Sequence, residues 1–178
     1  MSTLHVENLK GLTSGGNANK VIIPTGQTLE VADNIRHDDM PAGSVSQVKH
    51  TTHSNFDSTS SSFVDVVSLT FTPKHTGSVI IVRYNGHLYK YHNTANINVT
   101  SRLAHDAGGS GSFTTIVTHP YITYTGYSFK RMTTLHMTGA FTTTNTNAHT
   151  VKLEINPSGH RTYIYGISTA FTVEEFKQ

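Results

Sequence analysis

Apolar and polar residues alternate with a period of two along most of this chain, and no stretch favours an amphipathic helix. Val67, Leu69 and Phe71 alternate with serine and threonine up to Pro73, which is typical of a half-buried strand. Similar segments recur, with turn residues between them. Further strands are expected at 45–53, 78–84, 87–91, 97–103, 113–124, 132–141, 151–155 and 163–173.

Three segments in the first half of the chain carry more specific expectations. Residues 79–82 are four consecutive apolar residues, which indicates a strand covered on both faces. The dipeptide Asn85-Gly86 that follows predicts a tight hairpin turn. The serine- and threonine-rich residues 54–62 predict a long loop or an unpaired edge.

The last predicted strand, residues 163–173, places its larger side chains on one face and small ones on the other. Such a strand suits a sheet whose outer side packs against neighbouring subunits. An ordinary core strand is an equally good interpretation. The candidates for subunit contact are Tyr163, Tyr165, Ile167 and Phe171.

The pattern predicts an all-β fold, with an antiparallel jelly roll or β-sandwich over residues 45–178. Many short strands with regular turns form such folds, because each sheet must hide its apolar face against another. The composition agrees, since 28 threonines, 17 serines and only 13% charged residues favour strands and turns over helices. A length of 178 residues suits one domain with an appendage.

Residues 1–44 form that appendage, an extended β arm. Its short apolar segments, such as 21–23 and 29–31, are each separated by turn residues and suit one short strand. A strand of that size has no second layer to pack against, and an isolated hairpin is marginal in water. We therefore expect the arm to fold together with copies of itself, as in a fibrous or particle-bound assembly.

Composition and charge exclude several other classes. Without cysteine there is neither a disulfide framework nor a thiolate metal site. No stretch approaches the roughly 20 apolar residues of a membrane span, and the N-terminus does not resemble a secretory signal. The net charge of +2 combines −3 over residues 1–65 with +6 over residues 66–173. The cations of the basic part form no run, so nucleic acid is not an expected partner.

The arm resembles that of bacteriophage virion structural proteins, especially tail-fibre-like proteins of marine cyanobacterial phages. Residues 13–20 (TSGGNANK), 21–29 (VIIPTGQTL) and 41–45 (PAGSV) carry the resemblance. It implies a homotrimer whose arm docks on other virion proteins or threads into a three-stranded stem, so that the protein is part of the virion.

The body is similar in pattern to a tumour-necrosis-factor-like jelly roll. Residues 69–73 (LTFTP), 77–82 (GSVIIV) and 171–176 (FTVEEF) carry this similarity. It implies a distal globular head that recognises host-surface glycan or protein, as in a tail fibre or fibre tip. Similar trimeric modules also decorate capsids, which leaves a purely structural role as the alternative.

Clusters of tyrosine are the best binding candidates in the body. Tyrosine stacks on the apolar face of a sugar ring, while nearby cations satisfy hydroxyl or acidic groups. Subunit packing is the competing explanation, because tyrosine is also enriched at protein interfaces. The candidates are Tyr84, Tyr89, Tyr91, Tyr121, Tyr124, Tyr127, Lys130 and Arg131.

Catalytic, metal and cofactor sites are not expected. Between residues 66 and 173 the only carboxylates are Asp106 and Glu154, and both are expected to face solvent rather than flank a glycosidic bond as in a cleaving tailspike. The sequence has no nucleophile elbow and no phosphate-binding loop. Twelve histidines suggest metal binding, but none are two apart, as ligands on one face of a strand require.

Overall fold

The computed structural model describes residues 13–15, 40–90, 98–119, 131–166 and 169–178. The chain divides into two compact units, residues 1–36 and 37–178. The strands predicted in the arm lie outside the described residues. Within the described part of the second unit, ten β-strands and no α-helix are present.

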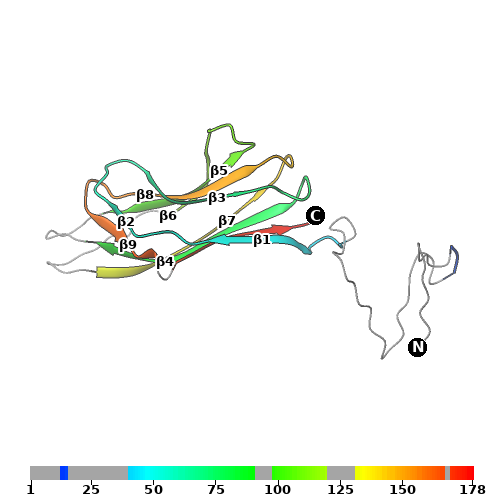
Figure 1. The fold of residues 1–178 in the computed structure, drawn as a ribbon, viewed down its shortest axis with the longest axis horizontal. Coiled ribbons are helices and arrows are strands. Elements are labelled where there is room, and N and C mark those ends of the chain that lie inside the picture. Colours follow the sequence, from blue (N-terminus) through cyan, green and yellow to red (C-terminus); the bar gives the residue numbers. More distant parts are fainter. Residues whose placement is uncertain (1–12, 16–39, 91–97, 120–130, 167–168) are drawn as a thin grey trace, which may run out of the picture. The chain divides into compact units, whose positions relative to one another are not determined.

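All ten strands pair in antiparallel fashion and form two sheets, which Figure 1 shows as two layers. Their bounds are β1 Val45–Thr51, β2 Phe56–Ser58, β3 Val64–Phe71, β4 Val79–Lys90, β5 Thr100–Ala107, β6 Thr114–His119, β7 Arg131–Thr142, β8 His149–Asn156, β9 Thr162–Ile164 and β10 Ala170–Phe176.

In sheet A, one edge of β4 pairs first with β10 and then with β9, and these two pair in turn with β1 and β2. The other edge of β4 pairs with β7. Sheet B has the order β3-β8-β5-β6. Neighbours such as β1 and β10 are far apart in sequence, and most connections between successive strands cross from one sheet to the other. This is the strand order of a jelly roll and confirms the predicted all-β sandwich.

The core lies between the two sheets and is made by alternate residues of facing strands. Its largest fully buried apolar side chains are Tyr84, Phe71, Phe171, Ile80, Leu88, Leu103, Leu135, Leu153, Ile155 and Ile164. The period-two alternation seen in the sequence therefore positions the core, as expected for sheets with one buried face.

The predicted turn at Asn85-Gly86 is wrong. Strand β4 passes through both residues and pairs with β7 without interruption, from Val79 opposite Thr142 to Lys90 opposite Arg131. Gly86 has another role, because a Cβ atom there would lie 2.5 Å from the hydroxyl oxygen of Tyr84. The glycine makes room for the tyrosine ring in the core.

The predicted single strand 163–173 is also wrong. It is broken into β9 and β10, which occupy successive stretches of the same edge of β4. Ile164 and Phe171 both face the core at 0% exposure, although an unbroken strand would put them on opposite faces. Gly166 lies at the break, where a Cβ atom would be 1.9 Å from the carbonyl oxygen of His53.

Residues 54–62, predicted as a long loop or an unpaired edge, contain the short strand β2, which lies at the edge of sheet A and pairs with β9. At the other end of sheet A the ladder extends before β1. The Gly43 N–H donates to the Lys177 carbonyl (2.6 Å) and the Lys177 N–H donates to the Ser44 carbonyl (2.9 Å). The chain is therefore fixed beside the C-terminal strand from residue 43 onward.

Candidate functional site

At one end of sheet A, four adjacent strands place a row of side chains on the outer face. Asp57 of β2 lies opposite Tyr163 of β9, Tyr163 opposite Tyr89 of β4, and Tyr89 opposite Met132 of β7. The residues before or after them, Phe56, Ile164 and Leu88, are buried in the core. Alternation along each strand therefore turns the row outward.

Three tyrosines of this region pack edge to face. The ring of Tyr165 lies 4.6 Å from that of Tyr89 and 4.4 Å from that of Tyr163, at interplanar angles of 88° and 71°. The Tyr89 hydroxyl donates to the sulfur of Met132 (3.0 Å), which is itself exposed. All three tyrosines are half-buried. We call Tyr89, Tyr163 and Tyr165 the tyrosine platform.

A charged pair adjoins the platform. Arg161, two residues before Tyr163, donates from Nε to Oδ1 of Asp57 (3.0 Å) and from a second nitrogen to Oδ2. The hydrogen bond from Arg161 lowers the pKa of Asp57, so the carboxylate is ionised at neutral pH. Both side chains are exposed.

This arrangement has the chemistry of a carbohydrate-binding surface. Edge-to-face packing fixes the orientation of the tyrosine rings, which can stack on the apolar face of a sugar ring. Asp57 accepts and Arg161 donates hydrogen bonds, as vicinal sugar hydroxyls require. Rigid apolar surface beside a few placed polar groups is the usual composition of a ligand site.

Of the residues predicted for ligand binding or subunit contact, some lie in the platform and others are buried in the core. Tyr89 lies in the platform together with Tyr163 and Tyr165, which were predicted as subunit contacts. The predictions for Tyr84 and Phe171 are wrong, because both are 0% exposed. The Tyr84 hydroxyl is 3.1 Å from Nε2 of His53, so it is satisfied inside the sandwich.

The other predicted residues lie outside the described part of the chain: Tyr91, Tyr121, Tyr124, Tyr127, Lys130 and Ile167. Arg131 begins β7, and the structure describes its backbone pairing with Lys90. Asp57 and Arg161 were not predicted. Asp57 falls in a segment that was expected to be a loop or an unpaired edge, and no local pattern links it to a residue 104 positions away.

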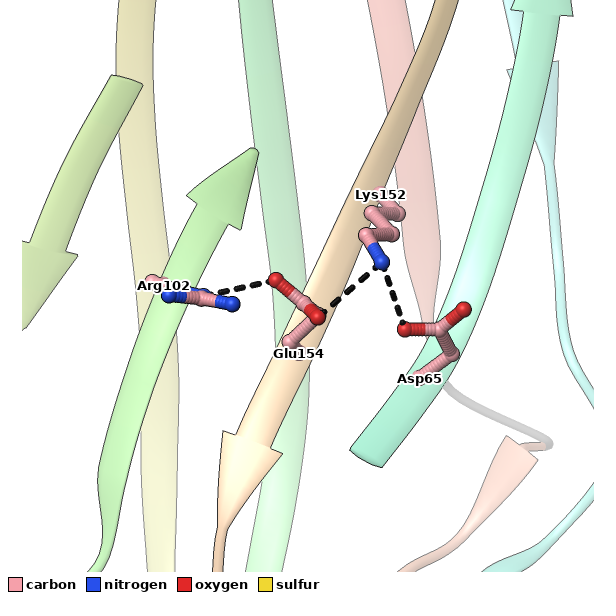
Figure 2. A network of polar contacts seen from close by, with 4 residues as sticks. All are labelled: Asp65, Arg102, Lys152 and Glu154. Carbon is pink, nitrogen blue, oxygen red and sulfur yellow. Dashed lines mark hydrogen bonds and ion pairs between the residues drawn. The ribbon is translucent and has the colours of Figure 1, made fainter. Parts of the chain in front are cut away.

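A second polar feature lies on the outer face of sheet B (Figure 2). Glu154 of β8 accepts from Nε of Arg102 on β5 (2.6 Å) and from Nζ of Lys152 (3.0 Å). Lys152 also contacts Asp65 of β3 at 3.0 Å. The network joins three neighbouring strands with two positive and two negative charges.

Aromatic rings cover this network. The Lys152 nitrogen lies 3.9 Å from the ring centre of Phe113, and the Arg102 guanidinium lies 4.0 Å from that of Phe63. Lys152 and Glu154 are consequently 12% and 6% exposed. Burial alone raises the pKa of Glu154, but Arg102 and Lys152 outweigh it and hold the pKa below its ordinary value. The group is a paired structural network.

The prediction that Asp106 and Glu154 face solvent is wrong. Asp106 is buried and accepts hydrogen bonds from Ser110 N–H (3.0 Å), the Ser110 hydroxyl (2.8 Å) and Gly111 N–H (2.8 Å). Arg102 lies opposite Glu154, and Asp106 is four residues further along β5. The two carboxylates are thus separated by roughly 13 Å along the strand, beyond the spacing of glycosidase pairs.

Among the described residues, no group of three or more histidine, aspartate or glutamate side chains is arranged to hold a metal ion. The same part of the chain has no helix of the length and hydropathy needed to span a membrane.

Comparison with known proteins gives structural neighbours only. No protein-family model and no curated protein matches the chain in sequence. The VP2 subviral particle of infectious bursal disease virus aligns with a TM-score of 0.43 at 13% identity, over 88% of this chain and 41% of that one. The Gt strain of the same virus gives 0.42 at 13%, over 86% and 44%.

A different kind of protein is also among these neighbours. The CBM22-1 xylan-binding domain of Paenibacillus barcinonensis Xyn10C aligns with a TM-score of 0.37 at 11% identity, over 78% of this chain and 99% of that domain. The chain spans less than half the length of the capsid proteins that it matches. At these scores and identities the neighbours do not bear on function.

Proposed function

We propose that this chain is a non-enzymatic structural protein of a virion, a trimeric tail fibre or fibre tip whose head binds glycan on the host surface. The arm, residues 1–44, attaches the trimer to other virion proteins. The observation that carries glycan binding is the tyrosine platform with the adjoining Asp57–Arg161 pair. The resemblance of the arm to phage fibre proteins supports the virion role.

The hydrogen bonds and ion pairs of the carboxylates support a non-enzymatic role. Glu154 is paired with two cations, and Asp106 holds the turn at Ser110 and Gly111. Asp65 lies opposite Glu154, but Lys152 contacts both carboxylates at 3.0 Å, so this pair is held by a cation and is not arranged around a glycosidic bond. Asp57 is held by Arg161, which suits a fixed hydrogen-bonding group better than a proton donor.

The platform is tested with a printed array of bacterial lipopolysaccharides and capsular polysaccharides, probed with the full-length protein. We expect Tyr163→Ala to weaken binding to the polysaccharide recognised by the wild type by about tenfold or more, because it removes a stacking ring. Tyr163→Phe keeps the ring and is expected to stay within about threefold. Affinities are measured by titrating that polysaccharide in solution.

Equal binding by the wild type and Tyr163→Ala contradicts the proposal. If Tyr163→Ala also has a reduced molecular mass, the platform is a contact between subunits. Thr138→Ala serves as the matched surface control, because Thr138 lies on the same face of sheet A, opposite Arg83 and away from the platform.

A further inference from the structure

The opposite end of the outer face of sheet A is apolar. Val45 lies opposite Phe176, which lies opposite Val79, and in the next row Ile81 lies across β10 from Val48. Val45 and Val48 are 43% and 57% exposed, and the other three are partly exposed. We call Val45, Val48, Val79, Ile81 and Phe176 the arm-end patch.

The sequence of β4 predicts more cover for the arm-end patch than the structure shows. Four consecutive apolar residues, 79–82, are typical of a strand covered on both faces. Ile80 and Val82 are covered by the core, but no described residue of the chain covers Val79 and Ile81 to the same extent. A central strand with an apolar outer face indicates a surface that another molecule covers.

The path of the chain indicates which molecule this is. Gly43 and Ser44 are hydrogen-bonded to Lys177, directly beside Phe176. The residues before Gly43 therefore enter the body beside the patch. If the arms of several copies pair with one another, they therefore bring the arm ends of the bodies together. Another copy of this chain is then the molecule nearest to the patch.

The charges among the residues of the patch suit contact between identical copies. Glu174, between Val48 and Ile81, pairs with Arg83 at 3.0 Å. Because these two charges neutralise each other, like copies bring no net charge of one sign together. A basic or acidic partner would find no complementary field on this patch.

We infer that the arm-end patch is the contact between the bodies of neighbouring copies of this chain in the assembled homotrimer. This inference rests on the self-assembly in the proposed function, but it does not depend on glycan binding, because the tyrosine platform lies at the other end of sheet A.

The test is the concentration at which the full-length protein dissociates, measured as molecular mass by light scattering over a dilution series. The wild type is expected to be a trimer, and Ile81→Asp is expected to dissociate at a concentration at least about tenfold higher, because only the arms then hold the copies together. Val48→Asp, on the edge strand β1, is a second variant that leaves the core untouched. Thr138→Asp adds the same charge on β7 outside the patch and is expected to remain trimeric.

Circular dichroism is used to check that each variant is folded. A wild-type monomer, or a trimer unaffected by both Ile81→Asp and Val48→Asp, would overturn the inference. So would equal dissociation of Thr138→Asp, because the effect would then not be local to the patch. The polysaccharide array distinguishes failure of this inference from failure of the proposed function. Each head carries its own complete tyrosine platform, so a folded monomer still binds polysaccharide.

Discussion

Replacing Glu175 with alanine is expected to lower the free energy of unfolding by about 4 kcal/mol. Its side chain is fully buried, and its carboxylate accepts hydrogen bonds from the backbone N–H groups of Lys74 (2.9 Å) and His75 (3.0 Å) and from the Gln47 amide (2.5 Å). The chain crosses from β3 in sheet B to β4 in sheet A at this turn, so the substitution releases one end of the sandwich.

The carboxylate must be ionised for this role. Burial alone raises the pKa of Glu175, but the hydrogen bonds from Lys74, Gln47 and His75 outweigh it and hold the pKa below its ordinary value. The contribution of Glu175 to stability is therefore complete above the ordinary pKa of glutamate. It is lost as the pH falls below that value towards the lowered pKa of the folded state.

Urea denaturation at pH 7 and equal protein concentration measures the effect of Glu175→Ala. The matched control is Asp57→Ala on β2, whose exposed carboxylate pairs with Arg161 at the surface. An exposed ion pair contributes less than about 1 kcal/mol. Equal losses from the two substitutions would show that the buried carboxylate does not hold the crossing between the sheets.

The jelly roll could be predicted from the sequence because its strands alternate locally. Val67 and Phe71 face the core as their period of two requires, and the long strands β7 and β8 fall within two residues of the predicted ranges. In a half-buried strand, the alternation of apolar and polar residues identifies which side chains face the core.

Local pattern failed where tertiary packing decides the conformation. Asn85-Gly86 is a frequent hairpin turn, but continuous pairing with β7 and the need for space beside Tyr84 keep it extended. The break between β9 and β10 reverses the face on which the following residues lie. Period two therefore assigned Phe171 to the wrong face of the sheet.

The candidate site was predicted only in part for the same reason. Tyrosines at 89, 163 and 165 were recognised as unusual, but whether they meet depends on the register between β4 and β9. The Asp57–Arg161 pair depends on the register between β2 and β9. Register between strands distant in sequence comes from side-chain packing across the whole sheet, which no short segment encodes.

Acidification from pH 7 to pH 4 is expected to remove up to about 3 kcal/mol of stability through one histidine pair. His105 of β5 and His149 of β8 lie inside the sandwich, with Nε2 of His105 2.7 Å from Nδ1 of His149. Nε2 of His149 lies 3.1 Å from the side-chain oxygen of Asn145. This geometry fits two neutral rings, in which His105 donates to His149 and His149 donates to Asn145.

Burial and the neighbouring histidine lower the pKa of His105 to about 4, and burial also lowers the pKa of His149. The nearby carboxylates of Asp106 and Glu175 act in the opposite direction without restoring the ordinary value. The unfolded chain takes up these protons near pH 6.5, whereas the folded chain resists them. Stability is therefore complete above pH 6.5 and falls steadily as the pH approaches 4.

Urea denaturation at intervals between pH 7 and pH 4 measures this slope. His105→Phe preserves an aromatic ring against Phe141, whose centre lies 3.7 Å from that of His105, but removes one titrating group. We expect it to start from a lower stability and to lose less as the pH falls. His50→Gln, at an exposed position on β1, should follow the wild-type slope. Parallel curves for the wild type and His105→Phe would contradict the prediction, whatever the difference in their absolute stability.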